Sequence, residues 1–480
     1  MKNSAKTENK ILSLACWMIP ATLILNVAGL VSFTEPRENI FSYLSIILFA
    51  TSFWFILLLF FERRQAACFG TLLSNQKEIT FANSISPQGV WLLFALSMTG
   101  LVCRLILLPN EPALSDDVWR YAWDGHITNA GVNPYLFAPN DSALETLRTD
   151  WFHRITFQNV RTVYPPLAQG ILALANQISP GYLGIKILFL LIEITVFITL
   201  YFLGRHFFSA YLMYYWLNPI IIFLNGSEAH LDLTVIPLLV PLILAFQNDY
   251  ADQNNSTQRI WQDHRFTISA VCLSLAALIK PYYAIGFSIF FTPPENKFTK
   301  ISFLRKWSSL LIVPLIIGAF IFPYRTDLWK LLESPLMYSN FWQFNSPVYS
   351  VLSRVMPEKA VRIFCYGFVA ILSIYFNVRS VTIKKREYFA IEHRLAYTFT
   401  IPFLFLPTIY PWYFLPGFFL AALTRDLNLL FLSVVLPLSY LSWNFEQWQL
   451  PGWVLSLEFI PLIIFWLLRS RQRNLDAMFK

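Results

Sequence analysis

The sequence predicts an all-α membrane protein, a polytopic transmembrane bundle of about 11–14 helices in one integral domain, residues 1–480. Of the 480 residues 56% are hydrophobic and only 13% are charged, whereas a soluble domain carries about 25% charged residues. Apolar runs of roughly 16 to 23 residues recur along the chain, close to the ~20 residues that cross a ~30 Å hydrocarbon core. This composition excludes a soluble globular protein.

The positions of lysine and arginine predict the orientation. Basic residues gather beside alternate apolar runs, which is typical of cytoplasmic loops. With the N-terminus in the cytoplasm, the longest polar stretch, 109–163, lies outside and forms an extracytoplasmic loop. The net charge is +8, but no continuous basic stripe with interleaved aromatic residues is present. We therefore expect contact with membrane lipids and no nucleic-acid partner.

Apolar length and charge together predict the order of the crossings. The run at 165–179 is expected to be interfacial or re-entrant, because a crossing there would move the downstream basic loops outside. Two short pieces, 267–279 and 281–293, are expected to meet on the outer side at Lys280-Pro281. The other predicted crossings lie near residues 11–32, 40–61, 89–108, 184–203, 208–224, 231–247, 308–323, 360–378, 395–410, 412–424, 427–442 and 452–468.

The polar loop opens with a predicted helix. Ser115 is a good N-cap residue, acidic residues follow in the first turn, and Gly131 with Pro134 provides a stop signal. The loop is therefore expected to be partly helical, with its acidic end only a few residues beyond a predicted crossing.

The acidic residues of this helix allow two interpretations. Asp117, Arg120 and Asp124 are spaced to share one face, so Asp116 and Asp117 could simply complement the helix dipole and pair with Arg120. The pair also lies at the membrane boundary, where a lipid headgroup would sit. Repulsion between adjacent carboxylates raises the pKa of one and makes it a better proton acceptor. Asp116 and Asp117 are therefore the catalytic candidates.

Cations and hydroxyls on the same side are candidate binding groups. Arg104 lies within an apolar run, where inserting an arginine into the membrane costs on the order of 3 kcal/mol unless it is paired or hydrated. Arg104 could therefore bind a lipid phosphate or form a structural ion pair with Glu193 or Glu228. Lys280 could equally be a turn lysine that snorkels to the interface. The full set of substrate-binding candidates is Arg104, Arg120, Tyr121, Asp124, Arg161, Tyr164, Glu228, His230, Asp232 and Lys280.

Three of these, Glu228, His230 and Asp232, fall within five residues between two apolar runs. Ionisable groups there are costly, so we expect them to line a polar substrate cavity. A metal site is conceivable, but the spacing matches no recognised ligand pattern. Five scattered cysteines without CxxC spacing add no metal site either. We expect no required cofactor, with a divalent metal still possible.

Aromatic residues mark two further segments, 340–345 and Tyr410-Pro411-Trp412-Tyr413. Their rings could stack on a sugar or belong to the aromatic belt at the membrane interface. The sequence leaves both interpretations open.

Together these motifs resemble the polytopic GT-C glycosyltransferases that use polyprenyl-phosphate sugars, particularly bacterial mannosyltransferase-like members. The resemblance covers most of residues 88–425. One departure is Ala229, where relatives often have a glycine directly before the histidine; another is that two helices precede the acidic loop, where many relatives have one. The resemblance rests on residues 115–135, Tyr164-Pro165-Pro166-Leu167, Asn218-Pro219 with Glu228, His230 and Asp232, Lys280-Pro281-Tyr282, and Pro411-Trp412-Tyr413.

The resemblance implies a membrane enzyme that moves a hexose, expected to be mannose, from a polyprenyl-phosphate donor to an unknown lipid or glycan acceptor. Asp116 or Asp117 would be the general base of an inverting reaction, and nearby Arg or Lys groups would stabilise the leaving phosphate. The expected place is the bacterial plasma (inner) membrane, with the active site facing outward. The alternative is a secondary transporter or lipid flippase, which broken helices would favour, but no second copy of the breaks is visible.

Overall fold

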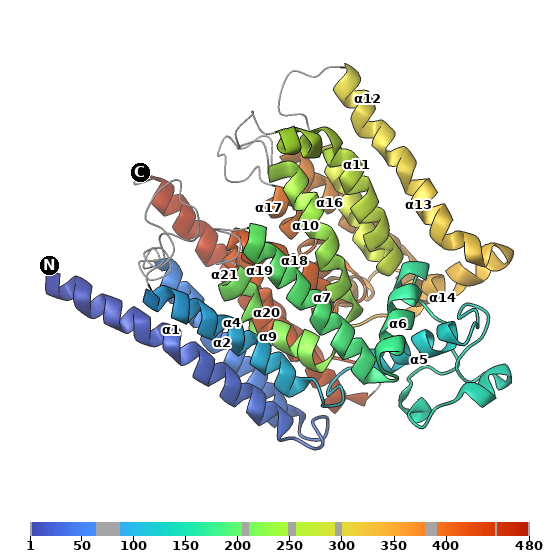
Figure 1. Ribbon diagram of the computed structural model, residues 1–480, viewed down its shortest axis with the longest axis horizontal. Helices are drawn as coiled ribbons and strands as arrows, with labels where there is room; N and C mark the ends of the chain where they lie inside the picture. Colours follow the sequence, from blue (N-terminus) through green and yellow to red (C-terminus); the bar gives the residue numbers. More distant parts are fainter. Residues whose placement is uncertain are drawn as a thin grey trace. The chain divides into compact units, whose positions relative to one another are not determined.

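The structure is a computed structural model that describes residues 2–63, 87–203, 211–247, 256–292, 300–379, 391–446 and 449–478. Within these ranges the regular structure is helical, and the only β pairing is an isolated bridge between Phe344 and Thr408 (Figure 1). The predicted all-α class is confirmed.

Seven helices in the described ranges are long and apolar enough to cross a membrane, or up to eight if a broken pair is one span. The protein is therefore an integral, multi-pass membrane protein. The broken pair is Pro219–Ser227 with Leu231–Phe246, and the shorter apolar helices are Trp17–Val31, His264–Ile279, Pro281–Phe291 and Pro411–Thr424. The seven long spans are Ile40–Glu62, Val90–Leu107, Tyr182–Leu203, Phe303–Phe341, Glu358–Val378, Leu427–Asn444 and Gly452–Arg471.

Several predicted crossings are not continuous α-helices, and two of them illustrate this. The segment expected at 208–224 is described from residue 211, where π-type turns flank a short α-helix that begins at Pro219. The segment expected at 395–410 leaves α-helical geometry after Thr398 and continues as a 3₁₀ turn from Pro402. Proline lacks an N–H and cannot extend the preceding helix, which accounts for both interruptions.

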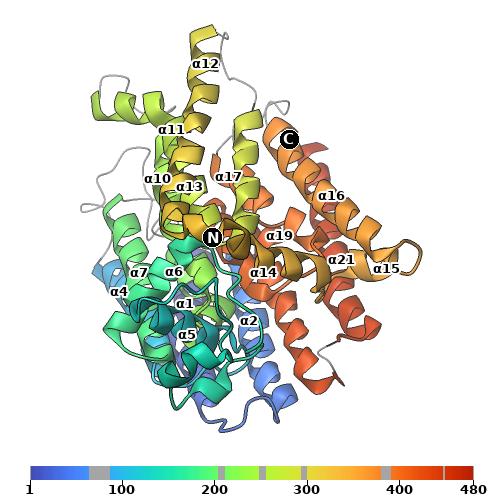
Figure 2. The ribbon, with the colours of Figure 1, turned by 90° about the vertical axis from the view of Figure 1, so that its right-hand side faces the viewer.

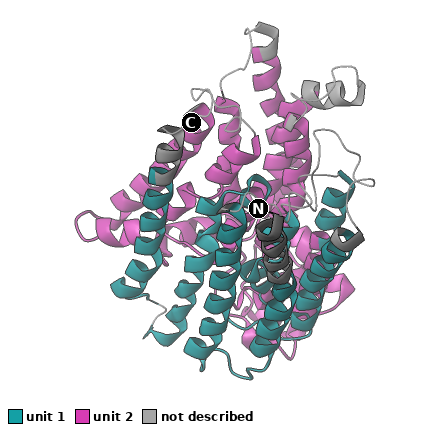
Figure 3. Cartoon of the chain, turned by 90° about the vertical axis from the view of Figure 1, so that its left-hand side faces the viewer, with its two compact units in different colours: residues 1–114, 194–228, 421–480 teal, residues 115–193, 229–420 magenta. Residues whose placement is uncertain are grey.

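The chain forms two compact units, coloured teal and magenta in Figure 3. Unit 1 comprises residues 1–114, 194–228 and 421–480, and unit 2 comprises residues 115–193 and 229–420. Two of the four boundaries pass through helices, namely α7 (Tyr182–Leu203) and α18 (Leu415–Thr424).

Unit 1 is held together mainly by apolar packing, with a few polar ties. The indole of Trp54 donates to the carbonyl of Met213 at 3.2 Å, and Arg469 pairs with Glu62. Its elements are α1 (Lys2–Val31), α2 (Ile40–Arg63), α4 (Pro87–Leu107), η4 (Tyr211–Trp216), α9 (Pro219–Ile222), η5 (Phe223–Ser227), α19 (Leu427–Leu430), α20 (Leu432–Val435), η14 (Leu436–Asn444) and α21 (Gly452–Met478).

Unit 2 contains the polar loop from Ser115 onwards and the helix that follows it. Helices α5 (Asp117–Asn129) and α6 (Pro166–Ile178) lie side by side (Figures 1 and 2). A β-carbon at Gly125 would lie 2.2 Å from the carbonyl oxygen of Leu172, so only glycine allows this approach. With 13 residues, α6 is about 20 Å long at 1.5 Å per residue and is too short to cross a bilayer upright.

The rest of unit 2 contains one very long apolar segment, Phe303–Phe341, and only 6% of the 18-residue apolar window within it is buried. Its 39 residues would measure about 58 Å as one helix, so only part of it can cross a ~30 Å hydrocarbon core. The remaining elements are η2 (Ser142–Leu147), η3 (Phe152–Arg154), η6 (Leu231–Val235), α10 (Ile236–Gln247), α11 (Ser256–Ile279), η8 (Pro281–Phe291), α12 (Lys300–Ser308), η9 (Ser309–Leu311), α13 (Ile312–Ile321), η10 (Phe322–Asp327), α14 (Leu328–Phe341), α15 (Pro347–Leu352), α16 (Glu358–Arg379), α17 (Ile391–Thr398), η12 (Pro402–Phe405) and η13 (Pro411–Phe414).

Candidate active site

The acidic helix starts slightly later than predicted. Asp116, not Ser115, is the N-cap of α5, and the helix proper begins at Asp117. The Ser115 hydroxyl accepts a hydrogen bond from the Asp117 N–H at 3.3 Å, a local side-chain bond that competes with helix continuation. The predicted stop is confirmed, because α5 ends at Asn129 and Gly131 adopts a φ of 78°.

The carboxylate of Asp117 is directed towards unit 2's polar interior. Tyr121 donates its hydroxyl hydrogen to Asp117 Oδ2 at 3.3 Å, and Nδ1 of His230 lies 3.7 Å from the same oxygen. The Asp117 side chain nevertheless keeps 34% of its surface exposed. It is therefore both held in place and accessible.

The pKa of Asp117 reflects these neighbours. Burial by itself raises this pKa, whereas the interaction with His230 lowers it, and Lys280 and Tyr121 lower it further. The net result is a pKa below the usual value for an aspartate, so the carboxylate is ionised at neutral pH. The raised pKa expected for one member of the acidic pair is therefore not found at Asp117.

His230 lies at the end of a series of stacked aromatic rings. The imidazole is fully buried and stacks on Trp412 with 3.8 Å between ring centroids. Trp412 stacks on Tyr410 at 4.3 Å, and Tyr410 on Phe344 at 4.4 Å. The two aromatic segments identified in the sequence thus pack against each other inside unit 2. Neither nitrogen of His230 has a hydrogen-bond partner.

The residue before His230 has a strained backbone. Ala229 adopts a φ of 51° and is fully buried. This left-handed conformation costs a non-glycine residue about 1–2 kcal/mol. The departure noted in the sequence, alanine where relatives often have glycine, therefore falls at a position where glycine would carry no strain.

Asp232 is the centre of a buried cluster next to the break at Lys280-Pro281. Its carboxylate is fully buried and accepts hydrogen bonds from Lys280 at 2.5 Å, from Tyr283 at 2.7 Å and from Tyr282. A buried carboxylate needs such partners because desolvation of an unpaired charge is costly. Lys280, predicted to bind substrate, is 6% exposed and paired with Asp232.

Asp124 is the centre of a second buried cluster. Arg120 donates to one oxygen of this fully buried carboxylate at 2.9 Å, and Thr162 donates to the other at 2.5 Å. Gln169 of α6 donates to the Thr162 hydroxyl at 2.9 Å. The interpretation in which Arg120 pairs with the acidic couplet is therefore not what the structure shows, because Arg120 bonds to Asp124, one helical turn further along α5.

The remaining candidate residues of unit 2 are two tyrosines and an arginine. The rings of Tyr121 and Tyr164 meet edge to face at 5.1 Å. Burial and then the charge of Asp117 raise the pKa of Tyr121, so its hydroxyl is a neutral donor. Arg161 pairs with Glu333 at 2.6 Å, and these side chains are 19% and 43% exposed. This is the most accessible ion pair among those of the candidate residues.

Two candidate residues belong to unit 1. Arg104 is 1% exposed, donates to the carbonyls of Gly100 and Trp216 at 2.9 Å, and lies over the Trp216 ring. Glu228 accepts hydrogen bonds from the N–H groups of Ala113 and Leu114 at 3.1 and 3.0 Å. Glu228 thus fixes the backbone that leads into the acidic helix.

Two of the three residues considered as metal ligands have hydrogen-bond partners, which are backbone N–H groups for Glu228 and Lys280 for Asp232, and His230 lies 3.7 Å from Asp117. In the part of the chain that the structure describes, no group of three His, Cys, Asp or Glu side chains could hold a metal. Metal dependence stays a prediction.

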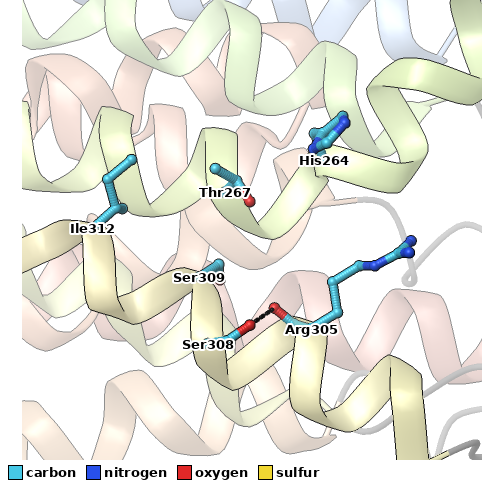
Figure 4. Close-up of a pocket in the computed structure, with 6 residues that line it drawn as sticks. All are labelled: His264, Thr267, Arg305, Ser308, Ser309 and Ile312. Carbon is cyan, nitrogen blue, oxygen red and sulfur yellow. Dashed lines mark hydrogen bonds between the residues drawn. The ribbon is translucent and has the colours of Figure 1, made fainter.

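A cavity of about 430 Å³ lies elsewhere in unit 2, between α11 and the segment from α12 to α13 (Figure 4). None of the candidate residues lines it, so it is separate from the acidic site. Its lining residues are His264, Thr267, Arg305, Ser308, Ser309 and Ile312.

Several residues of the site were not identified from the sequence. Tyr282 and Tyr283 directly follow Lys280-Pro281, and Thr162 precedes the Tyr164-Pro165-Pro166 element by two residues, so proximity to these motifs could have indicated them. Gln169 carried one weak signal, as a polar residue on the buried face of α6.

The fold is that of a multi-pass membrane protein, and comparison with known families supports a glycosyltransferase. Residues 66–292 match the family described as alpha-(1->6)-mannopyranosyltransferase, N-terminal domain. The protein is accordingly a membrane mannosyltransferase, which confirms the resemblance to bacterial mannosyltransferase-like proteins. The matched segment includes every candidate residue from Arg104 to Lys280. Comparison with curated proteins and with solved structures gives no match.

Proposed function

We propose that the protein transfers mannose from a polyprenyl-phosphate donor to an acceptor hydroxyl on the outer side of a bacterial plasma membrane, with inversion at the anomeric carbon. The observation that carries this proposal is the Asp117 carboxylate, which is ionised, partly exposed and held beside a buried polar cluster. The transporter alternative is set aside, because the family match supports an enzyme.

Asp117 would act as the general base. The acceptor hydroxyl attacks the anomeric carbon as its proton moves to the carboxylate, and the bond from that carbon to the phosphate oxygen breaks. Asp117 is favoured over Asp116 because its carboxylate faces the cluster of His230, Tyr121 and Lys280. Asp116 would contribute mainly as the N-cap of α5.

The leaving phosphate gains negative charge, so a cation should approach it in the transition state. Of the predicted cations in unit 2, Lys280 and Arg120 are paired with fully buried carboxylates. Arg161 has a partly exposed partner, Glu333, and an exchange of partners costs least where an ion pair is exposed. We therefore assign the donor phosphate to Arg161, with Tyr164 as a neighbouring hydroxyl.

Exchange of the two aspartates for asparagine, one at a time, tests the proposal. Transfer of radiolabelled mannose from prenyl-phosphate mannose is measured in membranes of source cells that contain only the variant and supply the endogenous acceptor. Asp117→Asn should lower kcat by about 10²–10⁴-fold, whereas Asp116→Asn should keep most activity. Full activity of a stably expressed Asp117→Asn would rule out this base.

A further inference from the structure

The cavity between α11 and the segment from α12 to α13 has one polar end and one apolar end (Figure 4). Arg305 and His264, both exposed, lie at the polar end. Ile312 lies at the other end, with serine and threonine side chains between. The volume of about 430 Å³ is in the range of small-ligand sites, roughly 300–1,000 Å³. The cavity is thus large enough for a ligand that is itself polar at one end.

The cavity lies where both of its walls become apolar. Arg265 on α11 and Lys306 on α12 are the last charged residues before the long apolar parts of these segments, which continue to Ile279 and Ile321. In a membrane protein such a change in composition marks the boundary between water and the hydrocarbon core. The basic residues place this boundary on the predicted cytoplasmic side. A group bound beside Arg305 would therefore lie at the depth of the lipid headgroups.

The polar end of the cavity adjoins a cluster of cations. The Lys306 ammonium and the Arg265 guanidinium lie 5.1 and 5.4 Å from the centre of the same ring, that of Phe266. The charges of Arg265 and Arg394 both act on Lys306, and Arg305 is its neighbour in the sequence. Like charges repel one another, so a bound anion would be stabilised at this position.

Lys306 differs from a lysine that simply extends to the membrane surface. Its side chain is buried, and its ammonium group donates to the carbonyl of Thr292 at 2.7 Å. A carbonyl accepts the hydrogen bond but does not neutralise the charge, and a buried charge is costly without an opposite one. Basic pockets of this kind, between helices on the cytoplasmic side, are typical sites for anionic headgroups.

We propose that this cavity binds the headgroup of an acidic phospholipid from the adjacent leaflet. The lipid phosphate would accept hydrogen bonds from Arg305 and His264. The acyl chains would pass Ile312 and follow the lipid-facing surface, where Leu311 and Leu315 are each 70% exposed. A free phosphate ion would leave the apolar end unfilled, and a choline headgroup would add a cation to the cluster. The site is independent of Asp117 and of the reaction proposed for it.

The serines of the cavity contribute space more than hydrogen bonds. The Ser308 hydroxyl donates to the carbonyl of Arg305 at 3.1 Å, and the Ser309 hydroxyl donates to the carbonyl of Lys306 at 2.6 Å. Their hydrogens are thus engaged within their own segment, while their small side chains leave the cavity open. A large side chain at Ser308 would fill it without any change of charge.

The test is native mass spectrometry of the full-length protein in detergent, titrated with phosphatidylglycerol or with phosphatidylcholine of the same acyl chains. The Kd of the first bound lipid should be lower for phosphatidylglycerol. Arg305→Gln should raise that Kd by about fivefold, the usual effect of one basic residue at an anionic membrane surface. Ser308→Phe should raise it as well, because the cavity is filled, whereas general attraction between charges would not change.

The matched control is Lys330→Gln, since Lys330 is a 44% exposed cation on the same long segment and does not line the cavity. Its Kd for phosphatidylglycerol should equal that of the wild type. Equal Kd values for the two lipids, or a wild-type Kd in both Arg305→Gln and Ser308→Phe, would overturn the proposal. A rise in unfolding temperature with inorganic phosphate, but none with phosphatidylglycerol, would assign the cavity to a soluble anion and would also overturn it.

Discussion

At the scale of single residues, the site depends on how buried charges are neutralised. Asp232 is fully buried and accepts three hydrogen bonds, one of them from the ammonium group of Lys280. Removal of one member of a buried pair leaves the other charge without compensation, which typically costs 3–5 kcal/mol. Lys280 is on this view a structural cation that keeps η8 attached to η6.

Lys280→Met should therefore destabilise the protein by about 3–5 kcal/mol, and Asp232→Asn added to the same chain should restore much of this loss. Thermal unfolding of the purified protein in detergent measures both effects. The control is Lys330→Met. Lys330 is 44% exposed and lies 3.9 Å from Glu333, and such an exposed ion pair contributes at most about 1 kcal/mol to stability. Equal unfolding temperatures for Lys280→Met and Lys330→Met would contradict this account.

The identity of the polar residues could be predicted from the sequence, but their partners could not. Arg120 has Asp117 three residues before it and Asp124 four residues after it, and helix geometry permits either pair. The choice depends on Thr162 and Gln169, which enclose Asp124 from segments far along the chain. Local spacing contains no information about those contacts.

At the scale of elements, the close contact of α5 with α6 places the acidic residues. Proline predicted the break at Lys280-Pro281 correctly, because a missing N–H acts locally. The 3₁₀ and π-type segments, such as Leu436–Asn444, could not be predicted, since hydropathy is the same for any helical geometry. Their course is decided by tertiary packing.

Gly125→Ala should separate α5 from α6, because its β-carbon would lie 2.2 Å from the rigid backbone oxygen of Leu172. We expect a loss of about 1–3 kcal/mol in stability and a lower rate, since α5 carries Asp117. Gly170→Ala on α6 is the control, because its β-carbon would meet no atom within 4 Å. Alanine also has a higher helix propensity than glycine, by up to about 1 kcal/mol. Similar melting temperatures for the two variants would show that the contact is not restrictive.

At the scale of the whole molecule, composition predicted the membrane class, because mean hydropathy is an average over all residues and does not depend on which residues are in contact. The division into two units could not be predicted, since each unit combines segments that are far apart in the sequence. The orientation of the chain in the membrane follows only from the distribution of lysine and arginine.

Orientation can be tested with single cysteines in a chain whose own five cysteines have been replaced. Ser142→Cys, at an exposed position of the polar loop, should react with a membrane-impermeant maleimide in intact cells. Asn254→Cys lies between the predicted crossings at 231–247 and 267–279, on the cytoplasmic side by the predicted orientation, and should react only after permeabilisation. The reverse pattern would place the acidic site on the cytoplasmic side of the membrane. The proposed donor would then have to be bound from the inner leaflet, which contradicts transfer on the outer side.

The left-handed backbone at Ala229 has a consequence for the interpretation of mutational scans. Side chains branched at the β-carbon would clash with their own main chain there, and longer ones would have no room in a fully buried position. Few replacements other than glycine should therefore be accepted, although the methyl group of Ala229 has no chemistry to offer a sugar. A scan scored on activity would mark residue 229 as intolerant, and the cause would be the placement of the neighbouring imidazole.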